Sequence, residues 1–198
     1  MKIIFAFIFL TLFSCKNFNQ EDKLLENIHV TDEEIYEVIN LIIGEHDKAM
    51  EKDGFKINFY RYVLDRDSEP LFSKTDSLYI FKTDTIFSKN DARFIQQQII
   101  NRKEFKFKSN YIKSKKVISE EIIKNIINER YKTGQTFYEI YEQKFGENLY
   151  YRIGLPVFSV DKKTVFIKFD SFGSGETLIY KKVKNKWRIY CKISNWIS

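Results

Sequence analysis

The clearest pattern in the chain is a stripe of apolar residues between positions 31 and 53. The stripe consists of Ile35, Val38, Ile39, Ile42 and Ile43, which recur at helical spacing. Thr31 and Glu34 have the spacing of a capping box, and Val30 and Ile35 that of a hydrophobic staple. The pattern therefore predicts a helix from Thr31 that ends by Gly54 and buries one face.

Three later segments also combine a start signal with helical periodicity. Their expected N-caps are Ser88, Ser119 and Thr136, followed by acids that include Asp91 and Glu139. The predicted buried stripes are Ile122, Ile123, Ile126 and Ile127 in the segment after Ser119, and Phe137, Ile140, Tyr141 and Phe145 in the segment after Thr136. Residues 132–135 and Gly146 are expected to end these two helices.

Strand-like alternation occurs in several places. Residues 55–65, 76–84 and 104–109 each predict a short strand between the helices. From residue 150 onward the period is two, with turns expected at 161–163, 173–175 and 184–186. One face of a strand should carry Val165, Ile167 and Phe169, and one face of the last strand Trp187, Ile189, Cys191 and Ile193. The predicted fold class is α+β, with N-terminal helices, a mainly antiparallel sheet and a C-terminal β-meander.

The N-terminal apolar run, from Ile3 to Phe13, follows Lys2 and precedes the small residue Ser14. It is too short to cross a bilayer, which takes about 20 apolar residues. Its basic start, apolar middle and small end are the layout of a secretory signal peptide. A buried element of a cytosolic domain is the alternative, but the polar residues 16–23 disfavour it.

Leu12, Phe13, Ser14 and Cys15 resemble the lipobox of bacterial lipoproteins. The resemblance implies cleavage before Cys15 and attachment of acyl chains, such as palmitate, to its sulfur and its new amino group. Two or more chains make a stable anchor, whereas one chain binds a bilayer only marginally. Lys16 after this cysteine is compatible with sorting to an outer membrane, and the domain would then face the periplasm or the cell surface.

The expected organisation is a signal peptide over residues 1–14, a flexible tether over 15–28 and a single globular domain over 29–198. With Cys15 acylated, Cys191 has no disulfide partner and is expected to be a buried, inert thiol. The chain contains only 7 Gly and 2 Pro, and its 43% hydrophobic residues supply a core for one domain.

Charge changes this picture little. The formal net charge is +6, but the excess is carried mostly by lysines interleaved with acids, and arginines are few. Nucleic-acid surfaces favour arginine, so we expect no nucleic-acid binding. The basic stretch 111–118 is expected to be a solvated loop or an edge strand.

The sequence offers little material for catalysis. His29 and His46 have no carboxylate at metal-ligand spacing, so we expect structural or solvated roles, with His46 on the polar side of its helix. Ser174 lacks the glycine that a nucleophile elbow needs, and no histidine follows it. No metal site and no cofactor are predicted.

Carboxylates and tyrosines are the remaining candidates. Asp161, Asp170 and Glu176 lie near predicted strand ends, and Asp170 could approach Glu176 across the Gly173 turn. Tyrosines are numerous, namely Tyr36, Tyr60, Tyr62, Tyr79, Tyr150, Tyr151, Tyr180 and Tyr190. They could form a recognition surface, although tyrosine is also simply a good strand residue whose hydroxyl reaches solvent.

Residues 87–99, 154–169 and 178–198 are loosely similar to blocks in uncharacterised small lipoproteins and secreted proteins of the Bacteroidota. The blocks are a helix with an acid and a Gln, a strand with an FS-x-x-D turn, and a closing hairpin with a Trp. No activity and no catalytic residue follow from this resemblance.

Two functions are compatible with these features. The favoured one is a non-catalytic, lipid-anchored module that binds a protein, glycan or small ligand in the cell envelope. The alternative is an envelope hydrolase that uses carboxylates near Asp170 and Glu176. An aromatic-lined pocket without converging acids would favour the first.

Overall fold

The computed structural model describes residues 25, 27–54, 60–65, 86–171 and 174–197. The expected signal peptide, Cys15, most of the tether and the strand predicted over 76–84 lie outside these residues, as do positions 55–59 of the first predicted strand.

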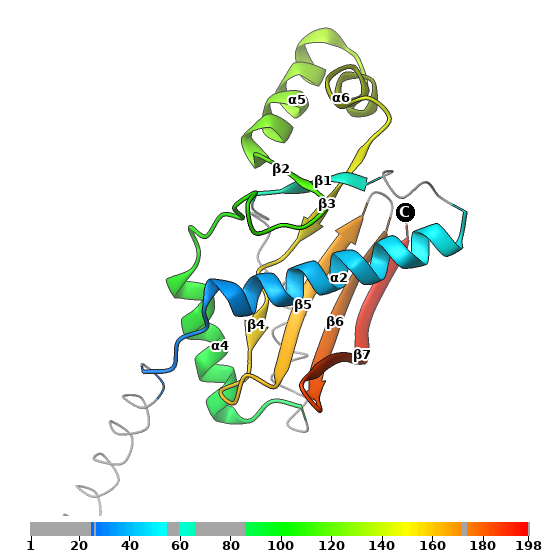
Figure 1. Ribbon diagram of the computed structural model, residues 1–198. Coiled ribbons are helices and arrows are strands. Elements are labelled where there is room, and N and C mark those ends of the chain that lie inside the picture. The colour runs from blue at the N-terminus through cyan, green and yellow to red at the C-terminus, as the bar shows by residue number, and fades with distance from the viewer. Residues whose placement is uncertain (1–24, 26, 55–59, 66–85, 172–173, 198) are drawn as a thin grey trace, which may run out of the picture.

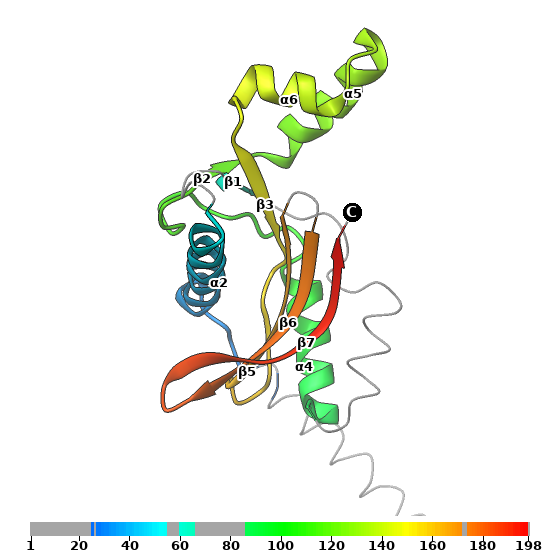
Figure 2. The same ribbon diagram turned by 90° about the vertical axis from the view of Figure 1, so that its right-hand side faces the viewer.

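The described chain forms a mixed sheet with a helix on each face and a helical hairpin beyond one end (Figures 1 and 2). The helices are α2 (Asp32–Lys52), α4 (Lys89–Asn101), α5 (Glu120–Thr133) and α6 (Phe137–Phe145). The strands are β1 (Tyr60–Leu64), β2 (Lys116–Ile118), β3 (Leu149–Ile153), β4 (Val157–Phe158), β5 (Thr164–Ser171), β6 (Ser174–Val183) and β7 (Lys186–Ile197). The α+β prediction is confirmed.

The strand order is β2-β1-β3-β5-β6-β7, and β4 pairs with β5 beside β3. The ladders from β3 to β7 are antiparallel, as predicted for a meander. By contrast, β1 pairs in parallel with both β2 and β3. Parallel pairing needs a crossover, and here α5 and α6 form the connection that carries the chain from β2 to β3 on the other side of β1.

Helix α2 crosses one face of the sheet (Figure 1). Its predicted capping box is confirmed, since Glu34 N donates to Thr31 Oγ1 while Thr31 N donates to the Glu34 carboxylate. All five predicted stripe residues are buried, and they pack on a core that includes Val165, Ile167, Phe169, Leu178 and Tyr180.

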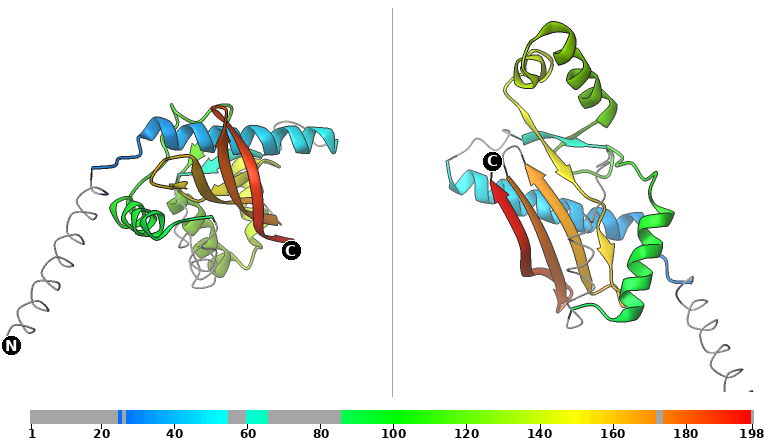
Figure 3. Two further views of the ribbon diagram at one scale, coloured as in Figure 1. Left: turned by 90° about the horizontal axis from the view of Figure 1, so that it is seen from below. Right: turned by 180° about the vertical axis from the view of Figure 1, so that it is seen from behind.

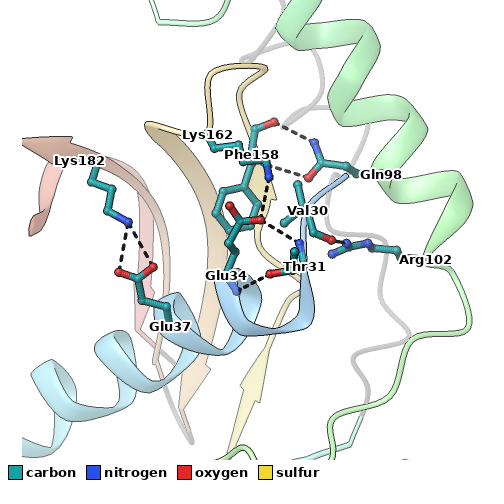
Figure 4. Close-up of polar contacts among 9 residues, drawn as sticks. All are labelled: Val30, Thr31, Glu34, Glu37, Gln98, Arg102, Phe158, Lys162 and Lys182. Carbon is teal, nitrogen blue, oxygen red and sulfur yellow. Dashed lines mark hydrogen bonds and ion pairs between the residues drawn. The ribbon is translucent and has the colours of Figure 1, made fainter. Parts of the chain in front are cut away.

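Polar contacts fix the N-terminal end of α2 against the neighbouring elements (Figure 4). Lys162 Nζ lies 3.0 Å from Glu34 Oε2, and Lys182 Nζ lies 3.3 Å from Glu37 Oε2. A guanidinium nitrogen of Arg102 donates to the carbonyl of Val30. The entry into α2 is thereby tied to the sheet and to the end of α4.

Helix α4 lies beside β4 on the opposite face of the sheet (Figure 3). It begins at the predicted N-cap Ser88, which forms a capping box with Asp91. Gln98 is buried and bonds both backbone groups of Phe158: its Nε2 donates to the carbonyl over 2.8 Å, and its Oε1 accepts from the N–H over 3.0 Å. The backbone N–H and carbonyl of Phe158, in the short strand β4, are thus both bonded by the side chain of Gln98.

Helices α5 and α6 project past the end of the sheet (Figures 1 and 2). Their predicted caps are confirmed at Ser119 and Thr136. The stripe predicted for α5 was half wrong. Ile123 and Ile126 are buried, but Ile122 and Ile127 are 38% and 39% exposed, because α6 and the sheet edge cover only a narrow face of α5.

Two strand predictions were also wrong. Residues 104–109 form no strand, since Phe105 and Phe107 pack on Tyr36 of α2 and the position beside β1 is taken by β2. In β7, the register shifts at Tyr190. Trp187 therefore joins the core under α2, while Cys191 packs with the cluster on the α4 side, so they do not share a face.

Candidate functional site

A groove of about 800 Å³ lies over α2. Residues on one face of the helix line it: Glu33, Tyr36, Glu37, Asn40 and Leu41. The loop 110–113 contributes one set of lining residues, and the turn between β6 and β7, with Asn185, Lys186 and Trp187, contributes another. This volume lies within the range of ordinary ligand sites, roughly 300 to 1,000 Å³.

Asn40 holds the loop wall in place. Its Nδ2 donates to the carbonyls of Tyr36 and Tyr111, each over 2.8 Å, and its Oδ1 accepts from Lys113 N over 2.7 Å. The Tyr111 ring stacks on Tyr36 with centroids 4.7 Å apart and planes 12° apart. One helix residue therefore fixes the loop, and a second supports its aromatic ring.

Tyr36 itself is anchored by the same segment. Its hydroxyl accepts from Lys108 N over 2.7 Å, and burial raises the pKa of its phenol. Tyr36 is 3% exposed, whereas Tyr111 is 36% exposed. Tyr111 is therefore the ring that the groove presents to solvent.

The hairpin wall is set by a tight turn. Lys184 and Asn185 have φ of 49° and 60°, the left-handed values that a two-residue turn requires. Trp187 lies two residues after Asn185. Its ring packs edge-on against the Phe158 ring, with centroids 6.2 Å apart, and Lys182 Nζ lies 5.0 Å from the centroid of the Trp187 ring. Its buried indole N–H finds no acceptor in the part of the chain that the structure describes.

The charged residues that line the groove are only partly paired, because Glu37 has a lysine partner and Glu33 has none among the described residues. Asp32, Glu34 and Glu37 are each paired with a lysine. Among the described residues, no side-chain hydrogen bond or ion pair engages Glu33, Lys113 or Lys186. The groove is therefore lined by unpaired charges of both signs, namely Glu33, Lys113 and Lys186, among the described residues.

A second polar cluster lies beneath the C-terminal half of α2, where it faces the sheet. Lys115 Nζ lies 2.7 Å from Asp47 Oδ2, and the lysine side chain is only 2% exposed. The Tyr151 hydroxyl donates to Asp47 Oδ1 over 2.8 Å and lies 3.0 Å from His46 Nδ1. Since that hydroxyl proton is used on Asp47, Nδ1 must be the donor to Tyr151.

His46 was predicted on the polar side of its helix, and this was wrong. Its ring lies 5.0 to 5.7 Å from those of Tyr60, Tyr151 and Phe169. Burial lowers the pKa of His46, although Asp47 and Glu176 act in the opposite direction. Nearby, the Tyr180 hydroxyl donates to Glu45 Oε2 over 2.8 Å. The cluster joins α2 to β3 and β6 through polar groups that satisfy one another.

The structure does not bring Asp170 and Glu176 together. Asp170 pairs with Gly175, and Glu176 with Phe169, so the two carboxylates lie on opposite faces of the sheet. Asp170 is 4% exposed and lies 3.4 Å from Lys168 Nζ, whereas Glu176 contacts Lys192.

Asp161 accepts hydrogen bonds from Ser159 Oγ and Lys163 N at the turn before β5.

The remaining residues that the sequence analysis singled out are Ser174, Cys191 and the tyrosines. Ser174 Oγ lies 2.7 Å from Ser171 Oγ. Cys191 is half-buried, and burial raises the pKa of its thiol. Tyr60, Tyr151 and Tyr180 are buried under α2, whereas Tyr190 is 54% exposed. Cys15 and Tyr79 lie outside the described residues.

The basic stretch 111–118 illustrates what sequence reasoning missed. Its last three residues form the edge strand β2, as predicted, but Lys115 is buried rather than solvated. Asn40 was also missed, although an amide four residues after Tyr36, next to the apolar stripe of the helix, is a signal.

Among the described residues, no group of three or more His, Cys, Asp or Glu side chains could hold a metal ion. No described helix is both long and apolar enough to span a membrane. No known protein family, curated protein or solved structure matches the chain.

Proposed function

We propose that the protein is a lipid-anchored, non-catalytic binding module of the cell envelope, and that the groove over α2 is its ligand site. The observation that carries this proposal is the groove itself, in which an exposed tyrosine and uncommitted polar side chains line one concavity.

The anchor rests on the sequence. The run Ile3–Phe13 and the lipobox ending at Cys15 support export, cleavage and acylation. Lys16 supports sorting to the outer membrane, with the domain in the periplasm or at the cell surface. The partners are then the membrane, through the acyl chains, and a protein, glycan or small ligand in the groove, but no nucleic acid.

Binding is favoured over hydrolysis by the placement of the acids. Glycoside hydrolysis needs two carboxylates facing one cleft, about 5 to 9 Å apart. Asp170 and Glu176 lie on opposite faces of the sheet. Glu33 and Glu37 do line the groove, but Glu37 is paired with Lys182.

The anchor is tested by Cys15→Ser in the native host. We expect the protein to leave the membrane fraction and to lose the acyl mass seen on the wild-type protein by mass spectrometry. Wild-type protein with an unmodified Cys15 and an uncleaved N-terminus would overturn the anchor.

The ligand site is tested by photo-crosslinking in intact cells. A benzophenone amino acid at Asn110, in the groove, should give an adduct, whereas the same residue at exposed Lys132 on α5 should not. Equal labelling at both positions, or at neither, would overturn the groove as a ligand site.

A further inference from the structure

We infer that the ligand of the groove over α2 is an uncharged oligosaccharide. This inference rests on the proposed function and names the ligand class of the same site. It follows from three properties of the groove: its unpaired polar groups, its exposed aromatic ring and its mixture of acidic and basic side chains.

The polar groups are those that sugar hydroxyls can bond. Glu33 supplies acceptors, and Lys113 and Lys186 supply donors. Within the described residues none of these three side chains has a hydrogen-bond partner. A sugar hydroxyl both donates and accepts, so a mixed set of this kind suits it better than a set of one sign.

The aromatic ring adds a flat apolar surface. Tyr111 is held at a fixed tilt by its stack on Tyr36 and by the Asn40 bonds to its loop. A pre-organised ring loses little conformational entropy on binding. The apolar C–H face of a pyranose can pack on such a ring, while its hydroxyl edge reaches the polar groups.

Other ligand classes fit less well. Because Glu37 is paired with Lys182, the unpaired charges of the lining are one carboxylate, Glu33, beside two lysines, so the groove lacks the dense positive charge that a phosphate-rich ligand needs. A peptide bound by strand addition needs a free sheet edge, but α2 contributes the largest part of the lining. Acyl chains would bury the uncommitted charges at a high energetic cost.

The test uses the acylated protein, with the benzophenone residue at position 110, crosslinked in its native envelope. We expect adducts that contain sugar by composition analysis and whose mass changes on periodate treatment, because periodate cleaves vicinal diols. Binding of the purified, detergent-solubilised protein to an array of defined neutral oligosaccharides should then weaken about fivefold in Glu33→Gln and in Lys113→Gln. Lys132→Gln is the matched control and should leave binding unchanged.

The outcomes separate the two proposals. An adduct that is a peptide or protein would overturn the oligosaccharide and leave the groove as a binding site. The absence of any adduct at position 110 would overturn both. Array binding that is insensitive to Glu33→Gln and Lys113→Gln would place sugar recognition elsewhere and overturn this inference.

Discussion

At the residue scale, the ion pair between Lys115 and Asp47 is notable because the lysine side chain is buried. The lysine side chain is 2% exposed and the aspartate 18%, so the charge on Lys115 is compensated by one carboxylate and by little solvent. Removing one partner of a buried pair leaves the other charge without compensation, which costs more than the pair contributes.

We therefore expect Asp47→Ala to lower the free energy of unfolding by about 3 kcal/mol, measured by urea titration. Glu129→Ala is the control because Glu129 and its partner Lys144 are each 41% exposed, and its effect should stay within about 0.5 kcal/mol. Equal effects of the two substitutions would mean that Lys115 is solvated in solution.

His46 gives the protein a predictable pH dependence. Burial lowers its folded-state pKa, whereas the unfolded value is about 6.5. The unfolded chain therefore binds more protons in the interval between the two values. Stability from this group should be complete above about pH 6.5 and decline as the pH falls toward the folded pKa, by at most about 1.4 kcal/mol per pH unit.

The measurement is urea unfolding at a series of pH values between about 7.5 and 5. His46→Gln should flatten the slope near pH 6, while His29→Gln, which changes an exposed histidine, should leave it unchanged. A slope that survives His46→Gln would assign the pH dependence to the carboxylates.

At the element scale, local signals predicted the helices well and the sheet partly. Capping boxes at Thr31 and Thr136 depend on residues three apart, so the sequence contains them in full. The same holds for the turn at Lys184 and Asn185. By contrast, the parallel pairing of β1 depends on residues far apart in the chain.

The candidate site was less predictable than the elements. The groove forms where α2, the loop 110–113 and the β6–β7 turn meet. These segments are far apart in the sequence, so no local sequence pattern predicts that they lie together. The bulge at Tyr190 likewise reverses which face Cys191 occupies, because one extra residue shifts the alternation of a strand. The prediction that Asp170 and Glu176 approach each other was wrong for a related reason, because the pairing register of β5 and β6 places their side chains on opposite faces of the sheet.

The docking of α4 depends on Gln98. Gln98→Leu removes both hydrogen bonds to Phe158 and leaves a buried N–H and carbonyl without a partner. We expect a loss of about 2 kcal/mol in the free energy of unfolding. Gln96→Leu, on the exposed side of the same helix, is the control for added apolar surface and should be near neutral. A near-neutral Gln98→Leu would show that water replaces the amide.

At the scale of the whole molecule, the described residues form a sheet body and an arm that consists of α5 and α6 (Figure 3). The arm has its own apolar cluster, in which Ile123, Ile126, Ile140 and Tyr141 pack with Leu64 of β1 and Ile118 of the edge strand β2. The core under α2 is a separate and larger cluster. Elements with few buried contacts to the rest open at lower free energy than the whole protein.

The arm should therefore open before the body, and Ile126 tests this. Ile126 is 0% exposed and its neighbour Ile127 is 39% exposed, so Ile126→Ala should cost about 3 kcal/mol and Ile127→Ala less than about 1 kcal/mol. In hydrogen exchange, Ile126→Ala should speed the amides of α5 and α6 while those of β5 and β6 keep most of their protection. Equal acceleration in the arm and in the body would instead mean that the two clusters unfold as one cooperative unit, because the contacts of α5 and α6 with β1 and β2 would then hold the sheet together as well.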